Sequence, residues 1–304
     1  MDHDFELSIP ASSANLGPAF DAAALALSLF LHVRARTSEQ FVITAAGRDA
    51  AISGNPDRHL IVETYLQTLA AAKREAPPLE LHLENEIPIG RGCGSSAAAR
   101  LAGVALASCY GKLNWSAQQV FEAAARAEGH ADNAAAAWWG GLVVTQGGEG
   151  HLHWLEVPVA KPWVVLLAVP RQPLATTAAR AVLPGQYSRQ DAVANLQSAL
   201  LLMGAFQQGR GDLVGAALGD RWHQPYRAAL CPLLETLQPL AGGNGILGVA
   251  LSGAGPSVVL LLESCDANEG ASAAARRAVD AAGLDAELLP TKIETCGPGR
   301  EWKS

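Results

Sequence analysis

The sequence lacks the cysteine pattern of a zinc site or of a disulfide framework. No two cysteines stand at the short spacing of metal ligands, and their number is odd: Cys93, Cys109, Cys231, Cys265 and Cys296. A reduced chain of this kind is typical of the cytosol, and the acidic residues 1–4 do not resemble a signal peptide. The sequence therefore predicts a cytoplasmic protein without disulfide bonds or structural zinc.

Positive charge and long apolar runs are also scarce. Lys and Arg total 22 against 29 Asp and Glu, the formal net charge is −7, and the basic residues are scattered. This distribution excludes the basic footprint of a nucleic-acid-binding protein. The apolar run at residues 22–33 is interrupted by Ser28 and His32 and is too short to cross a bilayer. We expect no nucleic acid and no membrane among the partners.

Apolar residues, in contrast, are abundant. They make up 49% of the 304 residues and charged residues only 17%, so the chain can bury the cores of two modest domains. Residues 79–84 alternate strictly between apolar and polar, which predicts a strand, whereas residues 95–110 are typical of an alanine-rich helix. Such patterns recur along the chain and predict an α+β fold of two domains, residues 1–158 and 159–304.

The other expected elements follow from the same periodicities. Strands are expected at residues 5–10, 41–45, 142–145, 152–157, 163–169, 246–251, 258–262 and 286–289. Helices are expected at residues 60–73, from Ser116 onward, and at residues 192–207, 213–218, 228–240 and 267–282. The polar, glycine-containing residues 11–18 are expected to form a loop.

The most informative segment is a glycine-rich loop before the alanine-rich helix. Glycine lets a backbone approach a ligand closely, and the first N–H groups of a helix are unpaired and carry partial positive charge. The segment therefore predicts a phosphate site, with a serine hydroxyl available to Mg²⁺. Its residues are Pro88, Ile89, Gly90, Arg91, Gly92, Cys93, Gly94, Ser95, Ser96, Ala97 and Ala98.

This loop is not a Walker A motif, because Gly94 is followed directly by Ser95 and no lysine intervenes. It does not fit the glycine spacing of the dinucleotide fingerprint either. An ordinary glycine turn before an N-capped helix remains the alternative. A second glycine loop, residues 251–257, stands between two apolar strands, where it could bring backbone close to a phosphate or form a plain turn.

Two further segments concentrate polar groups. In residues 10–21, Asn15 and Asp21 could face a substrate amine or hydroxyl, although short polar side chains in such a segment can also bond their own backbone. In residues 128–133, four polar groups lie beside an apolar run, and burying each without a partner would cost roughly 1–3 kcal/mol. A ligand is one partner that would satisfy them; the alternative is a solvated helix end capped by Gly129.

The four segments, taken in chain order, resemble the GHMP kinase superfamily, named for galactokinase, homoserine kinase, mevalonate kinase and phosphomevalonate kinase. They are residues 10–21, 88–98, 128–133 and 251–257. The resemblance is closest to the homoserine kinase branch. It implies an N-terminal domain like ribosomal protein S5 domain 2 and a ferredoxin-like C-terminal domain. It also implies ATP and Mg²⁺ as cofactors, L-homoserine as the substrate, O-phospho-L-homoserine as the product in threonine biosynthesis, and a homodimer.

The resemblance also implies roles for individual residues. The Mg²⁺ ligands would be Ser95, Ser96 and Glu122. Glu122 lies eight residues before His130, and the two could share one helix face. The substrate residues would be Asn15, Asp21, His130, Asp132, Asn133, Thr176, Arg180 and Arg227. Among these, Asn15, Asp21 and Asn133 are the candidate catalytic residues: the asparagines would position the hydroxyl, and Asp21 would anchor the ammonium group more than act as a base.

Arginine suits the carboxylate of an amino acid because its planar fork can bond both oxygens. The sequence departs from the family pattern at Ala19 and Ala24, where glycines are usual. If Ala19 had positive φ, strain of about 1–2 kcal/mol would follow, and Asp21 could shift. Two alternatives therefore stay open: a kinase of another small alcohol, such as an isoprenoid acid, and a nucleotide-binding regulator without catalysis.

Overall fold

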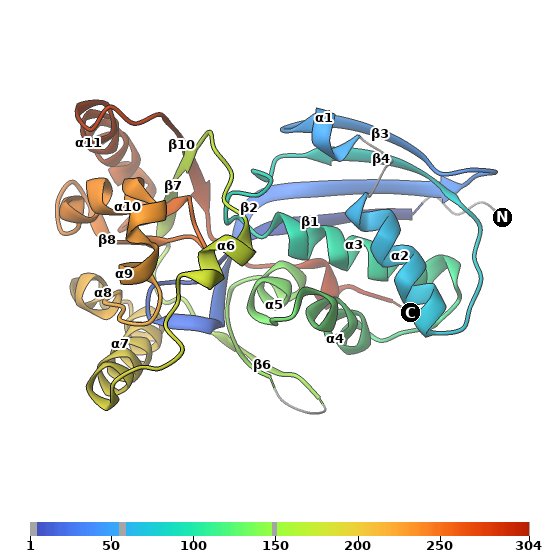
Figure 1. Ribbon diagram of the computed structural model, residues 1–304, viewed down its shortest axis with the longest axis horizontal. Helices are drawn as coiled ribbons and strands as arrows, with labels where there is room; N and C mark the ends of the chain where they lie inside the picture. Colours follow the sequence, from blue (N-terminus) through green and yellow to red (C-terminus); the bar gives the residue numbers. More distant parts are fainter. Residues whose placement is uncertain (1–4, 55–58, 148–150, 304) are drawn as a thin grey trace.

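Two β-sheets lie end to end along the molecule, each packed against helices (Figure 1). The computed structural model describes residues 5–54, 59–147 and 151–303. The acidic start considered above lies outside them. No helix among the described residues is long and apolar enough to cross a membrane.

The first sheet has six strands in the order β3-β4-β2-β5-β6, and β1 pairs with β2. Only the pairing of β3 with β4 is parallel. The strands are β1 (Phe5–Asn15), β2 (Ala19–Thr37), β3 (Val42–Gly47), β4 (Leu79–Asn85), β5 (Leu142–Gln146) and β6 (His153–Val157). The helices of this half are α1 (Ala50–Ser53), α2 (Leu60–Ala71), α3 (Ser95–Tyr110), α4 (Ala117–Glu128) and α5 (Asp132–Trp139).

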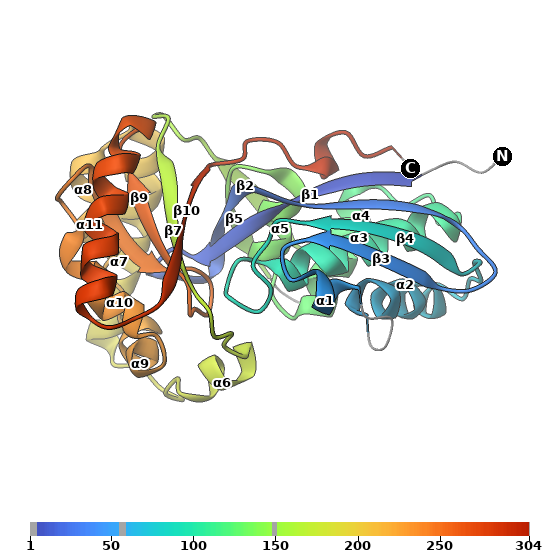
Figure 2. The same cartoon turned by 90° about the horizontal axis from the view of Figure 1, so that it is seen from above.

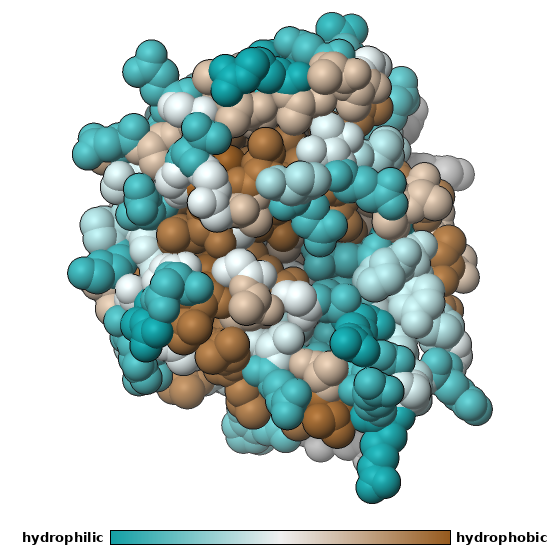
Figure 3. Space-filling view, turned by 90° about the vertical axis from the view of Figure 1, so that its left-hand side faces the viewer, coloured by the Kyte–Doolittle hydropathy of each residue, from teal (hydrophilic) through white to brown (hydrophobic). Residues whose placement is uncertain are grey.

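The second sheet is antiparallel, with the order β10-β7-β9-β8. Its strands are β7 (Val164–Pro170), β8 (Ile246–Leu251), β9 (Val258–Leu262) and β10 (Ala286–Lys292). Its helices are α6 (Thr176–Ala181), α7 (Arg189–Gln208), α8 (Gly211–Ala217), α9 (Gln224–Arg227), α10 (Pro232–Leu237) and α11 (Asn268–Ala281). At this end of the molecule, apolar side chains are visible in patches among hydrophilic ones (Figure 3).

Alternation along the strands decides which face of the first sheet is buried. In β4, Leu79, Leu81 and Leu83 are buried and belong to the core that also contains α2 and α3, whereas His82 points to the other face. Small residues let α2 and α3 pack closely: a Cβ atom at Gly103 would lie 2.6 Å from the backbone oxygen of Ile61. The alanine-rich composition of α3 thus serves helix packing.

Most predicted elements are confirmed, and two predictions are wrong. The helix expected at residues 95–110 begins and ends at those residues, and Ser116 caps α4 in a capping box. Residues 11–15, expected in a loop, continue β1 because they pair with β2. The single helix expected at residues 228–240 is divided into a 3-10 turn (Ala228–Leu230), the short helix α10 and a second 3-10 turn (Gln238–Leu240), since Pro232 and Pro239 lack the N–H group that would continue it.

The chain passes from the first sheet to the second between Val157 and Val164. Residues 293–302 then return to the first half: Ile293 bridges to Leu27, and the indole of Trp302 donates to the Trp115 carbonyl at 2.9 Å. Figure 2 shows this segment running back along the first sheet. The predicted domain boundary between residues 158 and 159 stays a prediction. Residues 293–302 belong to the predicted second domain but contact the first.

We expect Gly103→Ala to destabilise the protein by about 1–3 kcal/mol, because the new methyl group would collide with the backbone of α2. The matched control is Gly204→Ala in α7, where a Cβ atom would meet nothing within 4 Å. That control should be stabilising by roughly 0.5–1 kcal/mol, because alanine favours a helix. Urea denaturation of the three proteins checks both signs; equal stability of the two variants would contradict the close packing.

Candidate active site

The glycine loop between β4 and α3 is held in a conformation that only glycine adopts easily. Gly90, Gly92 and Gly94 have φ angles of 70°, 78° and 72°. A side chain at Gly92 would collide with the backbone oxygens of Ser252 and Gly255 in the second glycine loop. The two loops therefore touch through their backbones, and this contact excludes larger residues.

The loop ends at the N-terminus of α3, whose first N–H groups have no side-chain cap. Ser95 and Ser96 are the first two residues of this helix, and both line the adjoining cleft. Unpaired N–H groups and the helix dipole together favour an anion here. Cys93 is fully buried and burial raises the pKa of its thiol to about 11, so the thiol does not take part in the cleft.

The cleft beside the loop has a volume of about 100 Å³ and collects polar side chains from both halves of the chain. Thr176 and Arg180 come from α6 and Arg227 from α9, so the second half closes one side of it. The other predicted substrate residues line it too. The predicted residues found there are Asn15, Asp21, Gly90, Gly92, Gly94, Ser95, Ser96, His130, Asp132, Asn133, Thr176, Arg180 and Arg227.

At one end of the cleft, a carboxylate faces two guanidinium groups. Arg180 donates to both oxygens of Asp21, at 2.8 and 2.9 Å. Arg227 is only 1% exposed and donates from Nε to the Ala179 carbonyl. Burial, together with the neighbouring charge of Arg180, lowers the pKa of Arg227. Both arginines lie against the Phe20 ring, at 5.3 and 5.4 Å from its centroid.

Asn15 holds this end of the cleft in place. Its Nδ2 donates to the Gly253 carbonyl at 2.7 Å, and its Oδ1 accepts from the Asp21 N–H at 2.9 Å. Both ends of the amide that we expected to position the substrate hydroxyl are therefore engaged. The Nδ2 group does not form the local turn bond considered above, because its partner Gly253 is 238 residues away.

Strain at Ala19 does not arise. Positive φ occurs instead at Asn15, Leu16, Gly17 and Asp21, and Ala19 begins β2 in register with Asn15. Asp21 thus adopts a left-handed conformation, at φ 53°, without a glycine two residues earlier.

A histidine and an aspartate form a close pair at the other side of the cleft. The His130 Nδ1 lies 2.8 Å from the Asp132 Oδ1, and Asp132 is buried at the start of α5. Burial by itself lowers the pKa of His130, but the hydrogen bond and charge of Asp132 outweigh it, so the pKa is raised. Next to them, Asn133 Oδ1 accepts from Ser12 Oγ at 2.8 Å.

The acidic residue beside the two serines is Glu128. Its Oε2 accepts from Ser96 Oγ at 2.8 Å and from Arg100 Nε at 2.7 Å, and Glu128 lines the cleft. Glu122, the predicted ligand, is instead bonded to Gln118 and paired with Arg126 on α4. The structure does not bring Glu122 to the serines.

The reason is that α4 stops before the predicted spacing is complete. It ends at Glu128, and Gly129 turns the chain with a φ of 88°. Glu122 and His130 are therefore not on one continuous helix, and counting helical turns between them fails. The carboxylate that does lie beside the serines, Glu128, belongs to the polar cluster at residues 128–133.

A larger, mostly apolar cavity of about 580 Å³ adjoins the cleft and shares Gly90, Ser95 and Ser96 with it. This cavity could not be predicted from the sequence, because its walls come from segments far apart in the chain. They include Leu31, Ile52, His59, Ile61, Leu83, Ile87, Ile89 and Ala99. Burial lowers the pKa of His59, so this wall is uncharged near neutral pH.

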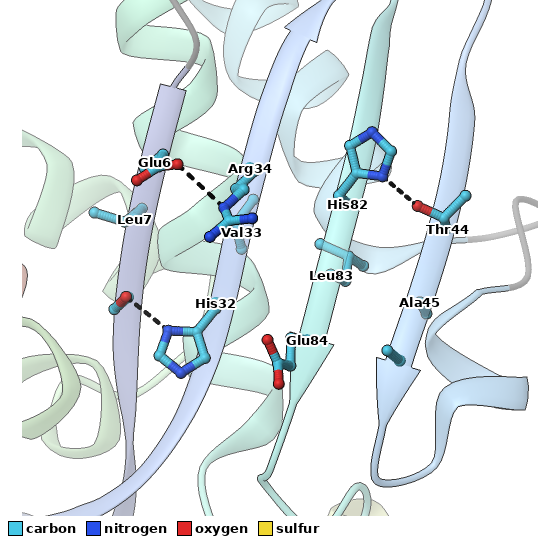
Figure 4. Close-up of a pocket in the computed structure, with 12 residues that line it drawn as sticks. Glu6, Leu7, His32, Val33, Arg34, Thr44, Ala45, His82, Leu83 and Glu84 are labelled. Carbon is cyan, nitrogen blue, oxygen red and sulfur yellow. Dashed lines mark hydrogen bonds and ion pairs between the residues drawn. The ribbon is translucent and has the colours of Figure 1, made fainter.

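Another hollow lies on the polar face of the first sheet (Figure 4). Its polar side chains mostly satisfy one another: Glu6 pairs with Arg34 at 3.1 Å, and Thr44 Oγ1 lies 2.6 Å from His82 Nδ1. None of the predicted site residues lines it. We therefore place the functional site at the glycine loop.

A glycine loop before an uncapped helix, placed between an apolar cavity and a small polar cleft, suits a nucleotide-dependent enzyme that acts on a small polar molecule. Two family models match the chain: GHMP kinases N terminal domain at residues 59–141 and GHMP kinases C terminal at residues 202–284. Together they span more than half of it, and the chain belongs to the GHMP kinase family. It is thus an ATP-dependent kinase, and the predicted superfamily and fold class are confirmed.

The similarity to individual relatives extends over most of the chain. A homoserine kinase of Solibacter usitatus is 46% identical over 261 residues, which cover 85% of this chain and 85% of that protein. A homoserine kinase of Synechocystis sp. is 36% identical over 301 residues, 96% of this chain and 97% of that one. The crystal structure of homoserine kinase from Cytophaga hutchinsonii matches the fold with a TM-score of 0.83, at 24% identity, over 97% of this chain and 96% of that one.

The His130–Asp132 pair predicts a pH dependence. Because the pKa of His130 is raised above its ordinary value of 6.5, the protonated pair stabilises the fold fully below pH 6.5. This contribution is lost as the pH rises through the folded-state pKa. In Asp132→Asn, burial acts without the opposing charge, so we expect the pKa of His130 to fall. An NMR titration of the imidazole checks the direction.

The matched control is Asp212→Asn, which removes an exposed carboxylate that pairs with Arg210. It should leave the His130 titration as in the unmodified protein. An unchanged titration in Asp132→Asn would mean that the hydrogen bond does not govern the charge of His130.

Proposed function

We propose that this protein transfers the γ-phosphoryl group of ATP to the side-chain hydroxyl of L-homoserine, giving O-phospho-L-homoserine in threonine biosynthesis. The single observation that carries the proposal is the charge arrangement of the cleft. Asp21 faces Arg180 and Arg227 within reach of the loop that binds phosphate. An amino acid with a hydroxyl side chain has the complementary ammonium group, carboxylate and acceptor atom.

The Asp21–Arg180 pair explains a preference for a zwitterion. Each charge neutralises the other while the cleft holds no ligand. A zwitterionic substrate can take the place of this pair, because its carboxylate binds Arg180 while its ammonium group binds Asp21. A ligand with a carboxylate alone would bind Arg180 and leave the carboxylate of Asp21 without its partner, which is unfavourable. This reasoning favours an amino acid over an isoprenoid acid.

The nucleotide would use the two adjoining spaces in different ways. The phosphates suit the backbone N–H groups of Gly90–Ser96 and the start of α3, which have no side-chain cap. The adenine base suits the apolar cavity, because the glycine loop forms a wall that this cavity shares with the cleft. The predicted ATP-binding stretch Pro88–Ala98 therefore contributes mainly backbone, with its two serine hydroxyls.

A magnesium ion fits the oxygen atoms next to the loop. The hydroxyls of Ser95 and Ser96 and the carboxylate of Glu128 are ligands that Mg²⁺ prefers, and Mg²⁺ commonly shares one carboxylate with substrate phosphates. Arg100 Nε donates at 2.7 Å to Glu128 Oε2, the oxygen that also accepts from Ser96 Oγ. When bound, the ion would neutralise negative charge on the phosphates. We therefore propose Glu128 in place of Glu122 as the acidic ligand.

The protein's contribution to transfer is mainly positioning. Phosphoryl transfer needs an attacking oxygen held in line and charge stabilisation on the phosphoryl oxygens. Asn133 is the better candidate to orient the hydroxyl, since its Oδ1 is fixed by Ser12, whereas both Nδ2 and Oδ1 of Asn15 already bond backbone groups. Asp21 is held by Arg180, which suits an ammonium anchor rather than a base.

The alternative of a non-catalytic regulator loses its main support. It depended on Ala19 and Ala24, yet Ala19 has no positive φ and Ala24 pairs regularly with Ala14 in the β1–β2 ladder. The substitutions do not displace the charged residues of the cleft. A cytoplasmic location and a homodimer stay predictions.

A coupled assay of ADP release tests the proposed substrate. We expect turnover with L-homoserine and little with mevalonate, shikimate or sugars, because only the amino acid satisfies Asp21 and Arg180 together. Asp21→Asn should raise the KM for homoserine by roughly tenfold or more, because a charged hydrogen bond contributes about 1.5–3 kcal/mol. Binding of a non-hydrolysable ATP analogue, measured by thermal shift, should be unaffected. Good turnover of another alcohol without turnover of homoserine would refute the proposal.

The two glutamates give a matched pair for the metal site. Glu128→Gln should raise the Mg²⁺ concentration needed for half-maximal activity and lower kcat by roughly tenfold or more. Glu122→Gln, on the same helix, should leave both within about twofold, because a partly exposed ion pair contributes little. Mn²⁺ binding in the presence of the nucleotide analogue, followed by electron paramagnetic resonance, gives a readout independent of turnover. A larger loss of activity and of Mn²⁺ binding in Glu122→Gln than in Glu128→Gln would instead support Glu122 as the ligand.

A further inference from the structure

A cavity of about 380 Å³ lies behind the glycine loop, where the two halves of the chain meet. Its walls come from both halves: Arg48 follows β3, Arg91 belongs to the glycine loop, Arg171 follows β7 and Arg276 lies on α11. Asp285 and Glu287 complete the charged lining. This cavity is separate from the cleft and from the apolar cavity, and the functions described so far do not use it.

The lining is positively charged in a protein that is negative as a whole. Four guanidinium groups against two carboxylates give the walls a formal charge of +2, while the chain carries −7. Counting Asp49, which accepts from Arg91, still leaves +1. Such a local excess attracts anions, and arginine forks fit phosphate and carboxylate oxygens.

Carboxylates hold two of the four arginines, Arg48 and Arg91, whereas the other two keep N–H groups available to a ligand. Arg48 is bidentate on Glu287, at 2.7 and 2.8 Å. Arg276, in contrast, donates from Nη1 to the Ala286 carbonyl, and the ion pair of Arg171 with Asp285 joins Nε to Oδ2 at 2.7 Å. The Arg171 side chain is 83% exposed. Among the described residues, the remaining N–H groups of Arg171 and Arg276 have no acceptor, so they are free to bind a ligand.

The cavity is coupled to the phosphate site through Arg91. Gly90 and Gly92 line the cleft, while Arg91 between them lines the cavity behind. Arg91 donates to Asp49 Oδ2 at 2.8 Å, and the same oxygen accepts from the Ile89 N–H at 3.0 Å. Arg91 also donates to the Arg171 carbonyl at 3.0 Å. This side chain therefore ties the glycine loop to α1 and to the second half.

We propose that this cavity binds a small multivalent anion, inorganic phosphate or a phosphorylated metabolite, and that the bound anion weakens ATP binding. The anion engages Arg171 and Arg276 and draws Arg91 away from Asp49 and the Arg171 carbonyl. The loop then loses the contacts that hold its N–H groups toward the cleft. By linkage, ATP weakens anion binding by the same factor. This effect depends on the proposed use of the loop for ATP.

Inorganic phosphate is the probe, and the variant is Arg171→Gln/Arg276→Gln. The matched control is Arg277→Gln, an exposed arginine next to Arg276 on α11 that does not line the cavity. Calorimetric titration is done with a saturating non-hydrolysable ATP analogue, which blocks phosphate from the catalytic loop. We expect the unmodified protein and the control to bind phosphate, and the double variant to bind it about tenfold more weakly or worse.

Kinetics then test the coupling. Millimolar phosphate should raise the KM for ATP about threefold or more in the unmodified protein and the control, with kcat nearly unchanged. In the double variant, the KM without phosphate should be normal and phosphate should not change it. Urea denaturation shows whether the variant is folded.

Two outcomes would overturn the inference. One is the absence of phosphate binding beside the ATP analogue; the other is equal inhibition of the double variant, which would place the phosphate at the catalytic loop. Turnover of homoserine, measured in the same preparations, separates the two proposals. A protein that phosphorylates homoserine and ignores phosphate rejects this inference alone, whereas phosphate binding without homoserine turnover rejects the proposed substrate and leaves the anion site supported.

Discussion

The site depends on one contact, the backbone packing of the glycine loop against the second glycine loop and the end of β1. Ser252 Oγ donates to the Gly92 carbonyl at 2.7 Å, and the Ser12 N–H donates to the Cys93 carbonyl at 3.1 Å. The Gly253 N–H donates to the Ala14 carbonyl at 3.0 Å. These bonds join three segments far apart in sequence, and they require residues without bulk.

This junction explains how one cleft can use residues from both sheets. It fixes the second half against the first, so that α6 and α9 present Arg180 and Arg227 opposite Asp21. The first N–H groups of α3 have no side-chain cap and remain available to a ligand. The proposed sites for phosphate and for a zwitterion therefore depend on the same packing.

Much of the fold could be predicted because its signals are local. Local pattern located α3 to the residue, and the polar-then-apolar start at Ser116 located the N-cap of α4. The error at residues 11–15 came where distant pairing overrode local composition. Residues 11–15 looked like a polar loop, yet their backbone groups pair with β2, and Ser12 and Asn15 bond partners in other segments.

The same distinction holds for the site. Its motifs were visible in the sequence, and the structure gathers all eight predicted substrate residues in one cleft, together with Gly90, Gly92, Gly94, Ser95 and Ser96. Seven predicted residues do not line this cleft: Pro88, Ile89, Arg91, Cys93, Ala97, Ala98 and Glu122. Glu122 pairs instead with Gln118 and Arg126 on its own helix. The engaged amide of Asn15 and the apolar cavity next to the loop could not be predicted, because both depend on segments that meet only in the folded chain.

By itself, the sequence determined that a glycine-rich loop leads into a helix at Ser95, because turn conformation and helix propensity depend on neighbouring residues. Only the tertiary structure decided that Glu128 lies beside the serines, that Arg180 pairs with Asp21 across 159 residues, and that Arg91 points away from the cleft. Those contacts depend on where distant parts of the chain come to lie, and no short-range pattern encodes that.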